Sequence, residues 1–188
     1  MSVGPTIALL GVSGAGKSRL ASRIVSARPD FLKLSAGKLL REALHTTGKA
    51  LRTAPSSDVL RNQERLVQVL RATRSGRVER PVLLEAHAFI DNDHELVDVP
   101  VAVMRAMDVS GLLVLVVPPE TIRGRRAADA DRRRPDRTAV ELARQQDHML
   151  ALARGYSREL PARMLVLDSG DVASALRFID EICADTNK

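Results

Sequence analysis

Short, almost wholly apolar runs alternate along this chain with longer segments in which apolar residues recur every three or four positions. Short apolar runs of this kind predict strands that are covered on both faces of a sheet, because such strands need no polar face. The runs expected to form strands are Thr6–Leu10, Phe31–Leu34, Pro81–Leu84, Leu112–Val117 and Met164–Leu167.

The segments between these runs predict helices. The expected helices are Ser18–Ala27, a helix after Ser35 as its N-cap, a long helix from Ser57 or Asp58 to about Arg74, a short one at Val101–Met107, one from Glu120 onward, Thr138–Tyr156 and Val172–Ala184. In the long helix Leu60 is expected on the buried face. The polar stretches His45–Ser57 and Ala86–Val99 predict loops, and the acidic run Asp91–Glu95 predicts a solvated surface.

Strands that alternate with amphipathic helices favour an α/β fold, in which a five-stranded parallel sheet carries helices on both faces. No repeat, low-complexity tract or linker interrupts the sequence, so residues 1–188 are expected to form one domain. Because ligands of open parallel sheets bind beyond the carboxyl ends of the strands, residues that directly follow strands are the first candidates for chemistry.

One such segment, Gly11–Ser18 (GVSGAGKS), fits the pattern G-x-x-x-x-G-K-[ST] between a predicted strand and a predicted helix. Glycines allow the backbone to curl until its N–H groups point at phosphate oxygens, and the helix N-terminus adds its positive end. The segment therefore predicts a P-loop that binds a nucleoside triphosphate with Mg²⁺. The residues expected to bind the nucleotide are Gly11, Ser13, Gly14, Ala15, Gly16, Lys17 and Ser18.

Within this cradle, Lys17 is expected to reach the β- and γ-phosphates and the Ser18 hydroxyl to bind magnesium. Phosphoryl transfer also needs an acid near the metal, and Glu85 follows the third predicted strand directly. Glu85 is thus the candidate for holding a magnesium-bound water. ATP and Mg²⁺ are the expected cofactors.

The composition of the chain limits the kinds of molecule that it is expected to bind. The net charge of +6 comes mostly from arginine, densest at Arg123–Arg137, and arginine binds the phosphates of nucleotides and nucleic acids alike. Aromatic residues make up only 2% of the chain, too few for a base-stacking platform, so a small nucleotide is favoured over RNA. A single cysteine, Cys183, and the absence of any apolar run near the ~20 residues of a membrane span predict a cytoplasmic protein without a membrane partner. Nothing indicates the oligomeric state.

Four segments together resemble the adenylate kinase-like nucleoside monophosphate kinases, in particular the archaeal-type adenylate kinases, from residue 7 to about residue 171. Besides the cradle they are Leu34–Arg41 (LSAGKLLR), Val82–His87 (VLLEAH) and Arg126–Arg134 (RAADADRRR). The first of these three is similar to an acceptor-binding segment S-T-G-D-x-L-R. The second is similar to a strand ending in D-T-H, and the third repeats the lid spacing R-x-x-D-x-x-R-x-R.

The resemblance implies that Mg·ATP donates its γ-phosphoryl group to a nucleoside monophosphate, with AMP as the expected acceptor. It places Gly37 and Arg41 beside the acceptor, Arg41 on its phosphate, in an acceptor-binding part of about residues 35–76. Glu85 and His87 would lie on the same side of the site, although His87 also fits a partly buried structural histidine.

The resemblance further implies a short Arg-rich lid over about residues 126–137. Its arginines Arg126, Arg132 and Arg134 would close over the transferred phosphoryl group and, with Lys17, stabilise the charge of the transition state. The same arginines also fit a solvated charged face or a nucleic-acid patch.

Two other functions remain open on the sequence. Ala36 and Lys38 replace the threonine and the acid of the acceptor segment, which favours a P-loop kinase acting on the hydroxyl of a small metabolite. The pI near 10.2 favours a nucleotide-dependent, RNA-associated assembly or regulatory ATPase.

Overall fold

The computed structural model describes residues 3–129, 134–168 and 171–186. Its main sheet has five strands in the order β2-β3-β1-β6-β7, all paired in parallel. The strands are β1 (Thr6–Leu10), β2 (Leu32–Ser35), β3 (Val82–Glu85), β6 (Val109–Val116) and β7 (Arg163–Asp168). The predicted α/β fold with a five-stranded parallel sheet is therefore confirmed.

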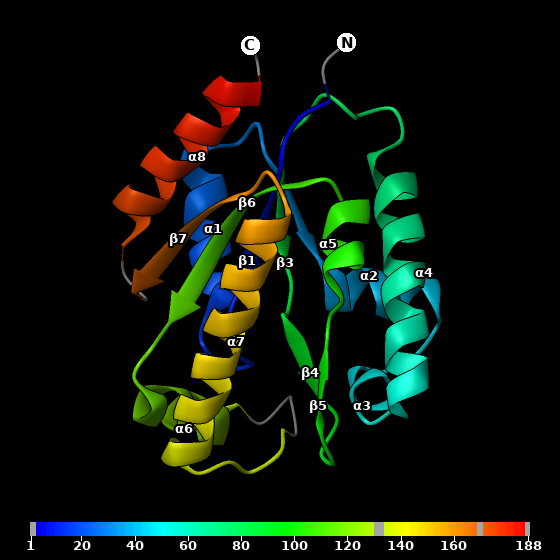
Figure 1. Cartoon of the computed structure of the whole chain (residues 1–188), viewed down its shortest axis with the longest axis vertical. Coiled ribbons are helices and arrows are strands. Elements are labelled where there is room, and N and C mark those ends of the chain that lie inside the picture. The colour runs from blue at the N-terminus through cyan, green and yellow to red at the C-terminus, as the bar shows by residue number, and fades with distance from the viewer. Residues whose placement is uncertain (1–2, 130–133, 169–170, 187–188) are drawn as a thin grey trace.

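Helices cover both faces of this sheet (Figure 1). On one face α1 (Lys17–Ala27) and α8 (Val172–Thr186) pack side by side, and on the other lie α4 (Ser56–Arg74), α5 (Val101–Ala106) and α7 (Ala139–Glu159). The remaining helices are α2 (Ala36–Ala43), α3 (Gly48–Arg52) and α6 (Pro119–Ala128). In Figure 1, α3 and α6 lie beyond the lower edge of the sheet, toward which the strand arrows point. No helix in the described ranges is long and apolar enough to span a membrane.

The three central strands lie in the middle of the core, which the buried faces of the helices complete. Side chains of β1, β3 and β6 such as Leu9, Leu83 and Leu113 are completely inaccessible to solvent, as continuous apolar runs require when both faces of a sheet are covered. The edge strand β7 is less enclosed, and its Val166 is 45% exposed. The rigid centre of the sheet thus fixes the ends of β1 and β3, where the candidate site begins.

Two segments predicted as loops contain regular structure. Within 86–99, β4 (Phe89–Asp91) and β5 (Leu96–Asp98) form an antiparallel hairpin, because Phe89 and Val97 are buried and pin its two strands to the core. Asp93 in its turn has a positive φ of 80°. Within 45–57, the short helix α3 is capped by Thr47, whose side chain accepts a hydrogen bond of 3.1 Å from the Ala50 N–H.

The predicted start of the long helix was also wrong. Helix α4 begins at Ser56, behind Pro55, and neither Ser57 nor Asp58 caps it. Leu60, expected on the buried face, is 41% exposed, because Val59 and Gln63 take the inward positions of that turn. Ser35 does occupy the N-cap position of α2, but its side chain makes no capping hydrogen bond.

Candidate active site

The loop between β1 and α1 forms a compact cradle. Gly14 and Gly16 have positive φ angles of 88° and 102°, a backbone conformation that residues with a Cβ rarely adopt. Lys17, only 9% exposed, folds back over the loop, and its Nζ donates to the Gly11 carbonyl at 2.5 Å. The ammonium group is thus held over the concave side of the loop, where the phosphates of a nucleotide would bind.

A hydroxyl and a carboxylate meet beside the cradle. Ser18 is the second residue of α1 and Glu85 ends β3, and the register that pairs Leu9 with Glu85 brings the two together. The Ser18 Oγ donates to Glu85 Oε2 at 2.5 Å, and the Lys33 Nζ lies 3.7 Å from Glu85 Oε1. Oxygen ligands of this kind suit Mg²⁺, which takes one or two protein oxygens and completes its shell with phosphates and water. The residues present therefore fit a magnesium ion.

Arginines from the segment after β6 lie against the cradle. The Arg126 Nε donates to the Ser13 carbonyl at 2.9 Å, and the Arg134 Nε donates to the Ser13 Oγ at 3.0 Å. Arg134 also pairs with Asp129 at 2.6 Å. One terminal nitrogen of each guanidinium, Nη1 of Arg126 and Nη1 of Arg134, is buried without a hydrogen-bond partner in the described part of the chain.

Arg134 is paired with Asp129, whereas the charge of Arg126 is poorly compensated. Burial lowers the pKa of Arg126, and the neighbouring Arg134 lowers it further by repulsion. A buried donor without a partner is costly, and two of them beside one loop indicate a place built for an anion that supplies the missing acceptors. Arg125 has a different position: its Nη1 donates to the Ala15 carbonyl at 2.6 Å, which ties α6 to the back of the loop.

A cavity of about 220 Å³ opens next to the cradle. It lies between the P-loop residue Ser13, the acceptor segment with Gly37 and Arg41, and the hairpin β4–β5. Arg41 has no hydrogen-bond or ion-pair partner among the described residues. Much of the remaining wall is apolar and consists of Leu40, Leu51, Val59, Leu66, Phe89, Val99, Met104 and Met107. The cavity thus combines cationic groups near the cradle with an apolar interior.

His87 lies between the cradle and the cavity. Its Nδ1 is 3.5 Å from the Lys17 Nζ, and its ring lines the cavity. The charge of Lys17, burial, and the charge of Arg126 together hold the pKa of His87 well below its usual range. A neutral His87 lets three cationic side chains, Lys17, Arg126 and Arg134, share this region without a fourth positive charge.

A neutral, buried histidine makes the stability of the fold depend on pH. Below about pH 6.5 the unfolded chain takes up a proton on His87 that the folded chain does not. The free energy of unfolding therefore decreases as the pH is lowered. Relative to His87→Gln, the wild type should lose about 1 kcal/mol more between about pH 7.5 and pH 5.5. Urea unfolding of both proteins at these two pH values measures the difference, and parallel pH profiles would contradict a depressed pKa.

Asp91 was predicted to be a solvated residue, and the structure corrects this. At the end of β4 its carboxylate lines the cavity and accepts hydrogen bonds from Arg137 Nη2 at 2.9 Å, Arg137 Nε at 3.1 Å and Gln145 Nε2 at 2.8 Å. Burial alone would raise the pKa of Asp91, but these donors outweigh it and hold the pKa below its ordinary value. Asp91 thereby anchors the segment that follows Arg134 to the hairpin.

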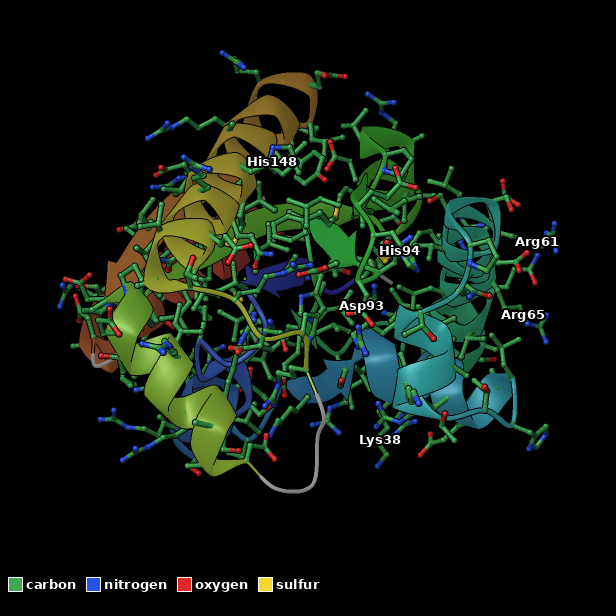
Figure 2. The ribbon with its side chains drawn as sticks, turned by 90° about the horizontal axis from the view of Figure 1, so that it is seen from below. Lys38, Arg61, Arg65, Asp93, His94 and His148 are labelled. Atoms are coloured by element: carbon green, nitrogen blue, oxygen red, sulfur yellow. The ribbon has the colours of Figure 1, made fainter. Side chains whose placement is uncertain are left out.

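Asp93 lies two residues further on, in the turn of the hairpin (Figure 2), and pairs with Arg52 of α3. Glu95 of the same turn accepts a hydrogen bond from Ser56 at the start of α4. One short hairpin therefore contacts α3 and α4 through Asp93 and Glu95, and the segment before α7 through Asp91.

Replacing Asp91 with asparagine is expected to lower the free energy of unfolding by about 2 kcal/mol, because a hydrogen bond to a charged group contributes about 1.5–3 kcal/mol. The side chains of Asp91 and Arg137 are only 13% and 23% exposed. Because the pKa of Asp91 is lowered, this contribution is present at neutral pH and is lost as the pH falls below the ordinary value of 3.8.

The matched control is Asp93→Asn, whose side chain is 37% exposed. An ion pair that is open to solvent contributes about 0.2–1 kcal/mol, so this variant should stay close to the wild type in urea unfolding. Equal losses in the two variants would show that the burial of Asp91 does not matter.

The structure brings most of the sequence-predicted residues to one place. The cradle residues, Glu85 and His87 lie together at the ends of β1 and β3, and Gly37, Arg41, Arg126 and Arg134 line the same cavity. Arg132 lies outside the described residues. The roles of all these residues in binding and catalysis stay predictions.

Tyr156 packs in the core, and its hydroxyl donates toward the carbonyls of Ala88 and Val99 at 3.1 and 2.5 Å.

Other side chains of the site escaped the sequence-based prediction. Asp91, Arg137, Gln145 and Gln63 come from three separate segments, and no spacing in the sequence signals that they meet. Lys33 was not predicted either, because its place beside Glu85 depends on the pairing of β2 with β3.

Comparisons with known proteins agree with this arrangement. A family model described as an AAA domain matches residues 10–143. The chain is 25% identical over 182 residues to an adenylate kinase from Pyrococcus abyssi, an alignment that covers 94% of this chain and 92% of the relative. It is 26% identical over 169 residues to an adenylate kinase from Thermococcus onnurineus, with 87% and 85% covered.

Two solved structures share the fold. One is a sugar kinase from Janibacter sp. HTCC2649, 20% identical, with a TM-score of 0.57 and coverage of 97% of this chain and 98% of the other. The second is a shikimate kinase from Bacteroides thetaiotaomicron, 16% identical, with a TM-score of 0.52 and coverage of 95% and 97%. At this level of identity the likeness concerns the fold alone.

Proposed function

This chain belongs to the AAA domain family of P-loop proteins, and from that premise we propose that it is a nucleotide kinase that transfers the γ-phosphoryl group of Mg·ATP to a nucleoside monophosphate. The expected acceptor is AMP, as for the archaeal adenylate kinases to which the chain is similar. The whole chain would act as one domain, with an acceptor-binding part over about residues 35–76 and a lid over about residues 126–137.

The observation that supports the proposal is a pair of buried guanidinium nitrogens, on Arg126 and Arg134, that find no hydrogen-bond partner among the described residues and lie beside a P-loop at the wall of a cavity. A cradle alone fits hydrolysis as well as transfer. A second, adjoining compartment with Arg41 at its wall provides room for an acceptor that also carries a phosphate.

In this proposal Gly11–Ser18 binds the donor phosphates through backbone N–H groups, and Lys17 exchanges its contact with the Gly11 carbonyl for the β- and γ-phosphates. Ser18 would bind Mg²⁺ directly and Glu85 through a water. Held by these residues, Mg²⁺ would supply positive charge that offsets the charge of the phosphates. Lys33, 3.7 Å from Glu85, balances that carboxylate as long as the metal site is not filled.

The acceptor phosphate would lie on Arg41, with Gly37 beside it, and its base in the apolar interior of the cavity. Arg126 and Arg134 would then donate to the phosphoryl group in transit, which carries its negative charge on peripheral oxygens. Because both guanidinium groups are already positioned by Ser13, little reorganisation is needed when charge develops.

The experiment that tests this function is phosphoryl transfer from Mg·ATP to a panel of ribonucleoside and deoxyribonucleoside monophosphates, followed by separation of the products. Transfer to one or two monophosphates, with a much slower release of inorganic phosphate, is the expected result. Steady hydrolysis of ATP that no monophosphate alters would refute the kinase proposal and point to the RNA-associated ATPase. RNA affinity that falls steeply with salt would then be sought.

A second candidate is a kinase for the hydroxyl group of a small metabolite. Two neighbours in fold, a shikimate kinase and a sugar kinase, motivate it. A cavity with Asn62, Gln63, Asp91 and Gln145 in its wall also offers partners to hydroxyl groups. Transfer to a sugar or hydroxy acid in the same assay, with no transfer to monophosphates, would favour this candidate.

A further inference from the structure

Two polar residues, Gln63 and Arg74, are buried on α4, and Gln63 is the one that lies in the middle of its apolar face. Positions 59, 63, 66 and 70 of this helix face inward at helical spacing, and three of them are Val59, Leu66 and Leu70. The fourth is Gln63, which is 6% exposed and lines the cavity together with Val59 and Leu66. A leucine at this position would continue the apolar face at no desolvation cost, so the amide needs an explanation.

The orientation of this amide is set by its one hydrogen bond. The Gln63 Nε2 lies 3.3 Å from the Val59 carbonyl oxygen. Since a carbonyl oxygen only accepts, the group that faces it must be the NH₂ and not the oxygen of the amide. The other end of the side chain, Oε1, has no hydrogen-bond partner within the described residues. The Oε1 atom of Gln63 is therefore an available hydrogen-bond acceptor at the cavity wall.

A second buried glutamine shows the contrast. On α7, Gln146 is 5% exposed, and it uses both ends of its amide: Oε1 accepts from the Val117 N–H and Nε2 donates to the Val117 carbonyl, each at 2.9 Å. Gln146 thus has a complete structural role at the end of β6. Gln63 uses only the NH₂ half of its amide within the described residues, and its oxygen is open to the cavity, where a ligand could bring a donor.

The surroundings of Gln63 indicate which part of a ligand it meets. On α4 it lines the cavity with Val59, Leu66 and the polar Asn62. The arginines of the cavity, Arg41, Arg52, Arg126 and Arg134, come from α2, α3 and the segment after β6. A monophosphate held by these arginines would extend its base toward the apolar side, where α4 forms the wall. There Gln63 offers one hydrogen-bond acceptor against a flat, largely apolar ring.

We propose that Gln63 is a specificity-determining residue for the acceptor, whose base donates a hydrogen bond from an exocyclic amino group to Gln63 Oε1. This inference rests on the proposed kinase function and adds a rule to it. Bases with an amino group at the far edge of the ring, adenine and cytosine, are selected over counterparts that carry a carbonyl oxygen there, because two acceptors facing each other repel.

Matched pairs of acceptors test the rule. AMP and IMP differ at one ring position by an amino group against a carbonyl oxygen, and so do CMP and UMP. For the wild type, kcat/KM should favour the amino member of a pair by about tenfold or more, the range expected when a buried polar group loses its partner. In Gln63→Leu the ratio within a pair should fall to about one, mainly through a higher KM for the amino member.

The control is Gln68→Leu, on the exposed side of the same helix, which should keep the wild-type ratio. Gln63→Met, close to glutamine in shape, serves as a second variant in case leucine disturbs the fold. Circular dichroism and the rise in melting temperature with Mg·ATP show that each variant is folded and has an intact donor site.

The outcomes separate the two proposals. Equal kcat/KM for both members of each pair in the wild type would overturn the role of Gln63 while the nucleotide kinase stands. A preference that survives in both folded Gln63 variants would overturn it in the same way. Absence of transfer to every monophosphate, with transfer to a metabolite hydroxyl or hydrolysis alone, would instead refute the proposed function.

Discussion

Replacing Lys17 with alanine is expected to lower kcat by about a hundredfold to a thousandfold, the loss seen when one preorganised charge-stabilising donor is removed from an active site. The Lys17 ammonium is buried in the cradle and points over its concave side, with the Gly11 carbonyl 2.5 Å away. In the transition state the same group would face the phosphate oxygens, where negative charge is concentrated. Steady-state transfer from Mg·ATP to the best monophosphate measures the effect.

The loss of kcat in Lys17→Ala depends on the position of the removed positive charge. Arg19→Ala is the matched control. Arg19 is a cation two residues along the same helix, but it is exposed. Its loss should leave kcat within about twofold, because exposed charges are screened by water and salt. Similar losses in both variants would show that the overall positive charge of the chain, and not the position of Lys17, supports activity.

Removal of Lys17 also affects its neighbour His87. The charge of Lys17 is the largest cause of the low pKa of that histidine. In Lys17→Ala the pKa of His87 should therefore rise toward its ordinary value, which titration of the His87 ring by NMR detects. The shift would show that the two side chains share one electrostatic environment, independently of any turnover.

The parts of the molecule that the sequence predicted well depend on short stretches of chain. Each strand of the main sheet contains a short run that is mostly apolar, and the cradle is eight consecutive residues between a strand and a helix. Glu85 could be predicted because it directly follows a strand, and the ends of neighbouring parallel strands meet. In these segments a short stretch of sequence is enough to predict the structure, because the fold needs the same residue types there as the local pattern shows.

The parts that could not be predicted depend on partners far away in the sequence. Asp91 and Asp93 look like surface residues in an acidic run, yet Arg137 and Gln145 bury the first while Arg52 holds the second at the surface. Gln63 looks like one of many polar residues of a charged helix. Only the packing of α4 against the sheet shows that it faces a cavity. The acceptor side of the site is assembled from such long-range contacts, and this is why its specificity was left open by the sequence.

The hairpin gives these long-range contacts a common support. Asp91 holds the residues after Arg134, and Asp93 holds α3, which borders the cavity through Gly48 and Leu51. Arg126 reaches the same region from α6, and within the described residues its guanidinium is held by one hydrogen bond, to the Ser13 carbonyl. Unlike Arg134, it has no ion pair there, so its removal should affect chemistry more than structure.

Replacing Arg126 with alanine is expected to lower kcat by about a thousandfold, since an arginine that stabilises a transferred phosphoryl group contributes about 10³–10⁵ to the rate. The free energy of unfolding should change by less than about 1 kcal/mol or increase, because the variant loses a buried nitrogen without a partner and the repulsion from Arg134. A large loss of activity without a loss of stability distinguishes a group kept for the transition state from one kept for the fold. Arg123→Ala provides the control, because Arg123 lies one turn earlier on α6 and is 61% exposed beside Glu120. If Arg126→Ala were fully active, or if it unfolded as it lost activity, the partnerless nitrogen of Arg126 would have no part in transfer.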